Sequence, residues 1–300
     1  MPSSRCPTHS ELVKGPHMSE FAGKRHVVTG AVSGIGHSVA EKQPASGTGR
    51  QNRLRERARA GVAYGMWCSI PAPVIAEFSG MADPDYVCID CQHGFVDYSG
   101  LVPMLQAMAR FDVTAVVRVS SQDPADIGRV LDAGAEAVIV PMVETSEEAA
   151  AVAAACRFPP RGTRSYGTTR ATAMLGSDID VLNAHVVCLV MIETEKGLGN
   201  IDAILTTPGV DGVYVGPTDL AISLGERPSD AGRGRHTQAI EHILDRCRVH
   251  RTIAGIHGYD RAAARRYSEM GFQMVTCAGD LPLLRSGLAG ELAAVRAPRS

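Results

Sequence analysis

Lysine is scarce in this sequence. Lys14, Lys24, Lys42 and Lys196 are the only four among 300 residues, whereas arginine occurs 26 times. A mechanism that needs an amine nucleophile would therefore depend on Lys196, because the other three precede residue 50. Lys196 lies in a Glu-Lys-Gly segment that is typical of a solvated loop. The composition thus disfavours Schiff-base catalysis and leaves Lys196 as its candidate.

Long apolar runs and a strong net charge are also missing. No apolar run approaches the roughly 18 residues that a membrane-spanning helix needs. The first residues contain no continuous apolar stretch of the kind found in secretory signals. A net charge of -2 offers no basic surface for nucleic acid or anionic lipid. With 45% hydrophobic and 21% charged residues, the composition is typical of an ordinary globular protein, which we expect to be cytoplasmic.

The eight cysteines do not form a convincing disulfide or zinc pattern. Cys88 and Cys91 have C-x-x-C spacing, but they bracket the end of a strand-like run rather than the start of a helix. No second pair completes a zinc site. A chain of this length does not need disulfides for stability. We interpret the cysteines as reduced, mostly buried thiols.

Residues 1–53 differ from the remainder. The segment Thr29-Gly-Ala-Val-Ser-Gly-Ile-Gly36 resembles the glycine turn of short-chain dehydrogenases, within a stretch of about residues 23–41. A linker-like sequence follows, and no tyrosine has a lysine four residues later, as that family requires. One strand and one helix cannot bury both their faces. We therefore expect a poorly structured extension with a truncated Rossmann-like fragment, and rank a nicotinamide-dependent dehydrogenase as a minor alternative.

From residue 54 to residue 300, short apolar runs alternate with helical patterns. The runs are mostly continuous rather than alternating, which is typical of parallel strands buried on both faces. The expected strands are Val62–Trp67, Tyr86–Ile89, Ala115–Val119, Ala137–Val140, Val186–Ile192, Gly212–Val215, Ile253–Ile256 and Met274–Thr276. The expected helices cover about 99–110, 124–133, 146–156, 200–206, 236–249, 260–270 and 281–295. Eight repeats predict a (β/α)8 TIM barrel, with a doubly wound sheet as the alternative.

Polar residues gather where these strands are expected to end. In such barrels the carboxyl ends of the strands form the active-site rim. Arg118 and Glu193 end otherwise apolar strands, where an unpaired charge would be costly. The residues expected at the rim are Asp90, His93, Arg118, Glu193, Asp219 and His257.

Several of these residues also have structural interpretations. Asp90 and Asp219 could each cap a helix, and His93 could bond a loop carbonyl. The role of His257 is open on sequence alone. Three arginines, Arg161, Arg164 and Arg170, follow the fourth strand in a Gly-rich loop, where they either face solvent or meet an anionic substrate.

Glu193 and Asp219 together suggest a site for a cation such as Mg²⁺. That ion needs few protein carboxylates and keeps several positions for water or substrate oxygens. Two oxygen ligands without a cluster of Cys or His disfavour zinc.

An ordered set of motifs resembles the HpcH/HpaI aldolase family over about residues 54–296. The motifs are Asp90-x-Gln-His93-Gly, Val-Val-Arg118, Val-Pro141-Met-Val, Pro160-x-Gly162-x-Arg164-Ser-Tyr-Gly, Met-Ile-Glu193-Thr and Gly-Val-Asp211-Gly-Val-Tyr-Val-Gly216-Pro-Thr-Asp219-Leu. The resemblance implies a barrel of the phosphoenolpyruvate/pyruvate-binding type. It also implies metal-dependent cleavage of a 4-hydroxy-2-oxo acid to pyruvate, or a related 2-oxo acid, and an aldehyde.

The same resemblance implies where the 2-oxo acid binds. Glu193 and Asp219 would ligate Mg²⁺, Mn²⁺ or Co²⁺, which would act as a Lewis acid. The backbone amides of Thr218 and Asp219 would hold the substrate carboxylate, in a segment that begins with Gly216 and Pro217. Homohexamers, built as trimers of dimers with exchanged C-terminal helices, are implied for the assembly.

The resemblance also implies the catalytic groups. Arg118 would stabilise the enolate oxygen, and His93, oriented by Asp90, would act as acid and base with a water molecule. Trp67 would shape the pocket wall.

This sequence departs from the family pattern in two places: many members have Gly-Glu-His in place of Cys91-Gln92-His93, and Gln in place of Met191. These departures concern the substrate and not the metal. A citrate-lyase-like enzyme that acts on an acyl-CoA is the main alternative.

Overall fold

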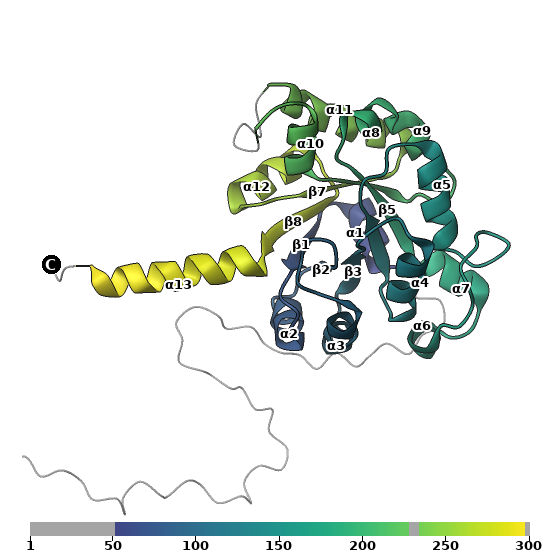
Figure 1. Cartoon of the computed structure of the whole chain (residues 1–300), viewed down its shortest axis with the longest axis horizontal. Coiled ribbons are helices and arrows are strands. Elements are labelled where there is room, and N and C mark those ends of the chain that lie inside the picture. The colour runs from purple at the N-terminus through teal and green to yellow at the C-terminus, as the bar shows by residue number, and fades with distance from the viewer. Residues whose placement is uncertain (1–51, 228–233, 298–300) are drawn as a thin grey trace, which may run out of the picture. The chain divides into compact units, whose positions relative to one another are not determined.

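The computed structural model describes residues 52–227 and 234–297, and these residues build a closed barrel surrounded by helices (Figure 1). Eight strands follow one another around the barrel in chain order, and β8 closes it by pairing with β1. All neighbouring strands are parallel. The (β/α)8 barrel predicted from the sequence is therefore confirmed. The predicted dehydrogenase-like fragment at about 23–41 lies outside the described residues.

The strands lie close to the predicted ranges. They are β1 (Ala63–Cys68), β2 (Tyr86–Asp90), β3 (Thr114–Arg118), β4 (Ala137–Val140), β5 (Val187–Ile192), β6 (Gly212–Val215), β7 (Ile253–His257) and β8 (Met274–Gly279). Every residue of β2 to β6 is buried, which agrees with their continuous apolar sequences.

The seven predicted helices are also present, but the sequence interpretation missed several short ones. The helices are α1 (Arg53–Ala60), α2 (Pro73–Met81), α3 (Tyr98–Met108), α4 (Pro124–Asp132), α5 (Ser146–Ala155), α6 (Thr169–Leu175), α7 (Ile179–His185), α8 (Glu195–Gly199), α9 (Ile201–Leu205), α10 (Pro217–Ser223), α11 (Gly234–His250), α12 (Arg261–Met270) and α13 (Asp280–Arg296). The missed helices, α1, α2, α6, α7, α8 and α10, span five to nine residues, too few to show a clear helical period. None of the helices in the described ranges is both long and apolar enough to cross a membrane.

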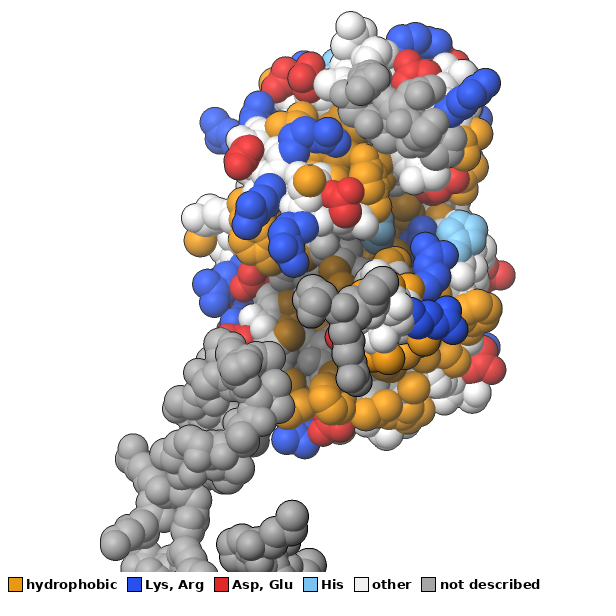
Figure 2. Space-filling view, turned by 90° about the vertical axis from the view of Figure 1, so that its left-hand side faces the viewer, with side chains coloured by type: hydrophobic (Ala, Val, Ile, Leu, Met, Phe, Trp, Pro, Cys, Tyr) orange, Lys and Arg blue, Asp and Glu red, His pale blue; other side chains and the backbone are white. Residues whose placement is uncertain are grey.

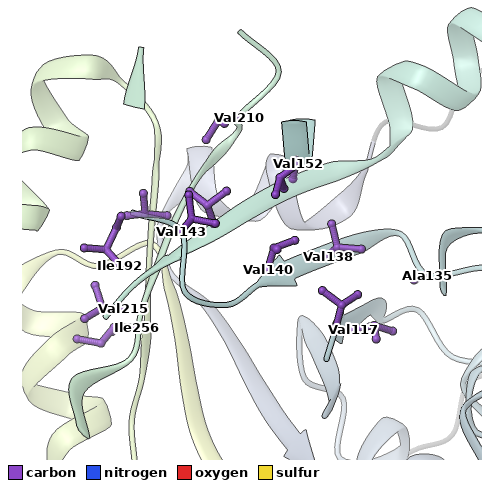
Figure 3. Packing of buried hydrophobic residues seen from close by; sticks show 14 of the residues in the cluster. Val117, Ala135, Val138, Val140, Val143, Val152, Ile192, Val210, Val215 and Ile256 are labelled. Carbon is purple, nitrogen blue, oxygen red and sulfur yellow. The ribbon is translucent and has the colours of Figure 1, made fainter. Parts of the chain in front are cut away.

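Two hydrophobic layers hold the barrel together. Inside it, side chains such as Cys88, Ile139 and Leu189 fill the space that the strands enclose. Outside it, side chains such as Val117, Val140, Val152 and Ile256 pack between strands and helices (Figure 3). Successive residues of a strand therefore face the two layers alternately, and both layers are apolar.

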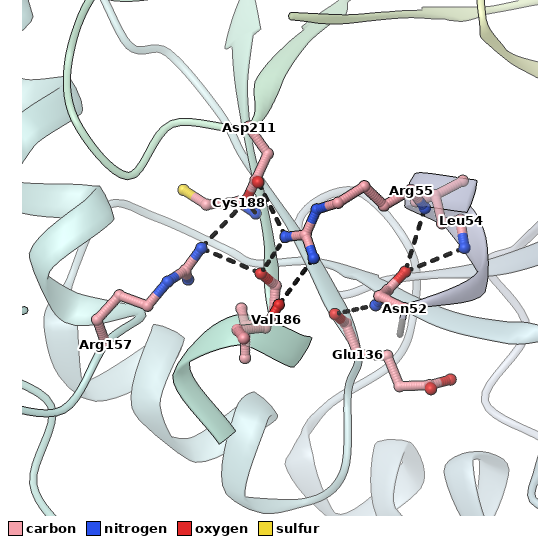
Figure 4. Close-up of polar contacts among 9 residues, drawn as sticks. Asn52, Leu54, Arg55, Glu136, Arg157, Val186, Cys188 and Asp211 are labelled. Atoms are coloured by element: carbon pink, nitrogen blue, oxygen red, sulfur yellow. Dashed lines mark hydrogen bonds and ion pairs between the residues drawn. The ribbon is translucent and has the colours of Figure 1, made fainter. Parts of the chain in front are cut away.

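Helix α1 covers the amino-terminal end of the barrel. Leu54 and Ala58 join the interior layer, and Asn52 caps the helix while donating to the Glu136 carbonyl at 3.0 Å. Arg55 pairs with Asp211 at 2.9 Å, and Arg157 reaches the other Asp211 oxygen at 3.1 Å (Figure 4). The charges at this end are thus neutralised by protein partners. The candidate catalytic residues lie at the opposite rim.

Candidate active site

A cavity of about 330 Å³ opens at the carboxyl-terminal rim of the barrel. It is lined by Trp67, His93, Arg118, Met191, Tyr214, Gly216, Pro217, Thr218, Asp219 and His257. The sequence analysis expected seven of these as site residues and weighed His257 as an eighth. The two other expected residues, Asp90 and Glu193, are buried directly behind this lining and act through contacts described below.

Asp90 and Arg118 form a buried ion pair at the ends of neighbouring strands. They are register partners on β2 and β3, so their side chains lie on the same face. Arg118 donates from Nε to Oδ1 at 2.8 Å and from Nη2 to Oδ2 at 2.7 Å, which is a bidentate geometry. Burial alone would raise the pKa of Asp90, but the Arg118 guanidinium holds it below its usual value. Asp90 therefore stays ionised, and Arg118 stays in one orientation.

Trp67 completes this unit. Its indole Nε1 donates to Oδ2 of Asp90 at 3.2 Å, and the Arg118 guanidinium lies 4.9 Å from its ring centroid. A cation over the face of an indole is favourable, and more so when both groups are desolvated. Trp67 thus forms a cavity wall that also fixes Arg118.

His93 lies in the loop after β2, with its side chain exposed at the cavity. Asp90 Oδ1 accepts hydrogen bonds from the backbone N–H groups of Gln92 and His93, at 3.0 and 3.3 Å. Asp90 therefore orients His93 through the main chain, and its carboxylate oxygens are occupied by Arg118, Trp67 and these amides. The imidazole remains available to the cavity.

Glu193 is held by an unusual loop. Its Oε1 accepts a hydrogen bond of 2.7 Å from the backbone N–H of Met142. Met142 has a φ of 57°, a left-handed conformation that costs a non-glycine residue about 1–2 kcal/mol. Gln122 braces the loop by donating to the Met142 carbonyl at 2.7 Å. The left-handed backbone at Met142 therefore directs its N–H group toward the Glu193 carboxylate.

Gly216 gives the second oxygen of Glu193 its space. A Cβ at Gly216 would lie 2.6 Å from Glu193 Oε2, so any larger residue would displace the carboxylate. Burial raises the pKa of Glu193, and the nearby Asp219 carboxylate raises it further against the opposing effects of Met142 and Arg118. Two neighbouring carboxylates repel one another unless a positive charge lies between them.

Asp219 is the third residue of α10 rather than its N-cap. The N-cap position is Gly216, and Pro217 is the first helical residue. The interpretation of Asp219 as a helix cap is therefore wrong, and its exposed carboxylate faces the cavity instead. The backbone N–H groups in the first turn of a helix have no partner within that helix, so Thr218 and Asp219 present donors at the same wall.

The donor set fits a hard divalent cation. Glu193 Oε2 and the Asp219 carboxylate offer oxygen donors, and Mg²⁺ or Mn²⁺ needs only one or two protein carboxylates when substrate oxygens and water supply the rest. No cluster of three His, Cys, Asp or Glu side chains occurs among the described residues, so no all-protein metal cage is formed there. The raised pKa of Glu193 indicates that an added positive charge would stabilise its ionised form.

Sequence reasoning missed two contributors. The Met142 amide gives no signal in the sequence because any residue carries a backbone N–H. Tyr214 does give one, since a phenol in the buried strand Gly-Val-Tyr-Val needs a hydrogen-bond partner. Its hydroxyl lies 2.6 Å from Thr276 Oγ1 and 3.5 Å from His257 Nδ1.

The arginines after β4 and Lys196 have other partners. Arg164 pairs with Asp132 at 2.7 Å, Arg170 donates to the Ala133 carbonyl at 2.9 Å, and Arg161 pairs with Asp180 at 3.1 Å. They do not line the cavity.

Lys196 is exposed and pairs with Glu144 at 3.0 Å. Glu144 raises the pKa of Lys196, which is the wrong direction for a Schiff-base nucleophile.

The fold and rim define a barrel enzyme with an acidic pair, a fixed arginine and an accessible imidazole. The HpcH/HpaI aldolase/citrate lyase family model matches residues 63–286. The 5-keto-4-deoxy-D-glucarate aldolase of Shigella sonnei is 38% identical over 228 residues, which cover 75% of this chain and 89% of that protein. The hydroxypyruvate/pyruvate aldolase of Rhizorhabdus wittichii is 39% identical over 233 residues, which cover 77% of this chain and 93% of that protein.

Solved structures agree with these matches. A crystal structure of an HpcH/HpaI aldolase/citrate lyase family protein from Burkholderia cenocepacia has a TM-score of 0.77 and 34% identity, and the match covers 82% of this chain and all of that chain. This chain belongs to the HpcH/HpaI aldolase/citrate lyase family. It is therefore an enzyme of the carbon–carbon lyase type, as the motifs predicted.

Proposed function

We propose that the enzyme is a divalent-metal-dependent aldolase that reversibly cleaves a 4-hydroxy-2-oxo acid to pyruvate, or a related 2-oxo acid, and an aldehyde. The observation that carries the proposal is the buried Glu193. Its Oε1 is fixed by Met142, and Gly216 keeps space around Oε2 beside the Asp219 carboxylate. A cation held here supplies Lewis-acid polarisation of the 2-oxo group. The names of the relatives, which include aldolases of keto-sugar acids and pyruvate, support this substrate class.

The 2-oxo acid binds at the wall formed by β5, β6 and α10. Glu193 and Asp219 hold Mg²⁺, Mn²⁺ or Co²⁺, and the amides of Thr218 and Asp219 donate to the substrate carboxylate. Gly216 and Pro217 shape this end of the cavity, because a side chain at Gly216 would collide with Glu193.

Arg118 and His93 carry out the charge and proton steps. Arg118 donates hydrogen bonds to the oxygen that becomes negative in the enolate, and Asp90 and Trp67 hold it there without reorganisation. His93 accepts the proton of the 4-hydroxyl as the carbon–carbon bond breaks and passes it to the methylene carbon of the enolate, which becomes the methyl group of pyruvate; the proton takes the reverse path in the synthetic direction. Trp67 excludes water from this side of the cavity.

The test is a pyruvate-consumption assay with a panel of hydroxyaldehydes and semialdehydes, run with Mn²⁺ or with EDTA. We expect consumption that requires the metal and is insensitive to borohydride. Consumption that survives EDTA and is abolished by borohydride would instead assign the chemistry to Lys196. If no aldehyde reacts but an acyl-CoA thioester does, the proposal is wrong and the citrate-lyase-like alternative is correct.

We also propose a homohexamer built as a trimer of dimers through α13. No residue of α13 is buried, and Leu284, Leu288 and Leu292 are each at least half exposed along it. A cavity of about 810 Å³ lies between α12 and the base of α13. Figure 2, which views the side from which α13 projects, shows hydrophobic side chains (orange) among lysine or arginine side chains (blue). Exposed apolar surface on this scale is typical of an interface.

Sedimentation at several concentrations tests the assembly. The wild-type chain is expected at six times its monomer mass, and replacing Leu284 and Leu288 together by Glu is expected to yield smaller species. A wild-type monomer would contradict the proposal.

A further inference from the structure

Asp280 is the first residue of α13, but its carboxylate is directed at the loop that follows β1. Oδ2 accepts hydrogen bonds from the backbone N–H groups of Ser69 and Ile70 at 2.9 and 2.8 Å, and Oδ1 accepts from Ser69 at 3.0 Å. Within its own helix the carboxylate accepts from the Leu281 N–H at 2.7 Å. The start of α13 lies beside the ends of β8 and β1 (Figure 1). Asp280 therefore connects α13 to a loop that lies 210 residues earlier in the chain.

The loop after β1 depends on Asp280 for its hydrogen bonds. The loop reads Ser69-Ile-Pro-Ala-Pro73, and its two prolines carry no backbone N–H. Ala72 donates to the Ile70 carbonyl at 2.8 Å within the loop. Among the residues that the structure describes, only Asp280 accepts from the Ser69 and Ile70 N–H groups. A carboxylate binds backbone amides more strongly than a neutral acceptor does, so Asp280 determines where this loop lies.

The loop after β1 in turn supports the loop that carries His93. The Ser69 carbonyl accepts a hydrogen bond of 2.9 Å from the Phe95 N–H. Gly94 is enclosed between the two loops. A Cβ at Gly94 would lie 2.2 Å from the Asp90 carbonyl oxygen and 3.1 Å from Ser69 Cα. His93 therefore directly precedes the point where the two loops touch.

The backbone around His93 is held from both sides along the chain. On one side Asp90 accepts from the N–H groups of Gln92 and His93, and on the other side Ser69 accepts from that of Phe95. Among the described residues, the hydrogen bonds of His93 involve its main chain and not its ring. The position of the imidazole is therefore set by the backbone on either side of it.

We infer that Asp280 positions His93 for proton transfer, through Ser69 and Phe95. The inference rests on the proposed aldolase function, in which His93 carries the proton. Asp280 is a positioning residue, because it does not line the cavity and reaches the reacting atoms only through the two loops. Proton transfer requires the two heavy atoms to lie within hydrogen-bond reach, and a displacement of about 1 Å can lower a rate about a hundredfold.

Two reactions of 2-oxo acids separate this role from general damage to the site. Exchange of the methyl protons of pyruvate for deuterium in D2O requires a base that removes a proton from carbon, which is the role assigned to His93. Decarboxylation of oxaloacetate breaks the bond to an ionised carboxylate, releases CO2 and leaves the electron pair in the same pyruvate enolate. No proton has to be removed in that reaction, and the enolate can take one from solvent. Both reactions need the cation site and Arg118, but only the exchange needs His93.

The main test measures both reactions in the Mn²⁺-loaded enzyme. Asp280→Ala is expected to lower kcat for exchange about 10- to 100-fold, while KM for pyruvate and the rate of CO2 release stay within about twofold of wild type. His93→Ala should give the same pattern with a larger loss. Asp280→Asn is the milder variant, because its amide oxygen still accepts hydrogen bonds, and exchange should fall about threefold. Proton NMR follows the exchange, and CO2 release is followed in a coupled assay.

Asp178→Ala is the matched control. Asp178 is the N-cap of α7, where it accepts from the backbone N–H groups of Asp180 and Val181 at 2.9 and 3.1 Å. Both rates should remain at their wild-type values. If Asp280→Ala lowers neither rate, or lowers both equally, the inference is overturned while the aldolase function stands. If the wild-type enzyme catalyses neither reaction, the proposed function fails and the inference fails with it.

Hydrogen exchange of the backbone tests the connection without turnover. The Phe95 N–H, followed by mass spectrometry, is expected to exchange about tenfold faster in Asp280→Ala, because the support of its hydrogen bond is lost. The Met142 N–H, which is bonded to Glu193, should exchange as in wild type. Unchanged exchange at Phe95 would overturn the inference. The same measurement decides the result if the wild-type enzyme exchanges pyruvate protons but leaves oxaloacetate intact.

Discussion

The two ends of the barrel differ in how completely their buried charges are paired. At the amino-terminal end, both oxygens of Asp211 are bonded by protein donors, namely Arg55, Arg157 and the Cys188 backbone N–H at 2.8 Å (Figure 4). At the carboxyl-terminal end, Glu193 has one oxygen fixed and the other beside a second carboxylate. The first end pairs its charges within the protein, whereas the second leaves a carboxylate incompletely paired, which is typical of functional sites.

The largest effect is expected at the incompletely paired end, from Glu193→Gln. The amide oxygen can still accept from Met142, but the second position no longer carries a negative charge for a cation. The kcat for pyruvate formation should fall about a thousandfold or more, since metal polarisation is worth several kcal/mol. Steady-state assays at saturating Mn²⁺ measure this loss.

The same substitution should not destabilise the protein. Burial raises the pKa of Glu193, so the folded metal-free enzyme holds an unfavourable carboxylate that Gln removes. In EDTA the unfolding temperature of Glu193→Gln is expected to equal or exceed that of wild type. Glu195→Gln, at an exposed position paired with Arg235, is the control and should change neither quantity. A fall in stability with retained activity would show that Glu193 is a structural residue.

Arg118 combines the two kinds of role. Arg118→Lys retains the charge but loses the bidentate pair with Asp90, and kcat is expected to fall about 10²- to 10³-fold. Arg118→Met leaves the buried Asp90 carboxylate without its counter-charge and should lower the free energy of unfolding by about 3–5 kcal/mol.

A double substitution separates the two roles of Arg118. Adding Asp90→Asn to Arg118→Met should recover much of the stability, as measured by urea unfolding, but none of the activity. Recovery of both would mean that Arg118 does not act on the substrate. Arg110→Lys, at an exposed pair with Glu77, is expected to behave as wild type.

At the opposite end, Asp211→Asn should change stability and leave kcat nearly unchanged. Arg55 and Arg157 would lose their shared anion, at about 2–3 kcal/mol, because Asp211 is about one-fifth exposed and the pair is partly screened. The unfolding temperature should fall by roughly 5–10 °C. Asp245→Asn, whose pair with Arg248 is exposed, should leave the unfolding temperature almost unchanged. A large loss of kcat in Asp211→Asn would contradict the division between the two ends.

The sequence predicted the strands because each is a short, continuous apolar run. A parallel strand is buried on both faces, so its residues do not alternate between apolar and polar. The sequence predicted the rim residues because Arg118 and Glu193 interrupt such runs where parallel strands end. Short helices such as α10 show no helical periodicity in the sequence, so Asp219 could be interpreted as a helix cap. The paired charge of Asp211 appeared in the sequence only as part of a motif, since its partners Arg55 and Arg157 are distant in the chain.

Details that depend on three-dimensional register could not be predicted. Asp90 and Arg118 are 28 residues apart, and only the alignment of β2 with β3 makes them opposite one another. The left-handed conformation of Met142 could not be predicted, because the position is not a glycine. The hydrogen bond between Tyr214 and Thr276 requires knowledge of which strands face one another inside the barrel.

The smallest expected effect is a pH dependence at the rim. The pKa of Asp90 is lower in the folded protein than its ordinary value of 3.8, so its ionised form stabilises the fold. That contribution is complete above about pH 4–5 and is lost as the pH falls below 3.8 through the lower folded value. The difference in unfolding free energy between wild type and Asp90→Asn should therefore be constant from pH 5 to 8 and shrink below pH 4. Urea unfolding at each pH measures it, and a difference that grows as the pH falls would show that Arg118 does not hold Asp90 ionised.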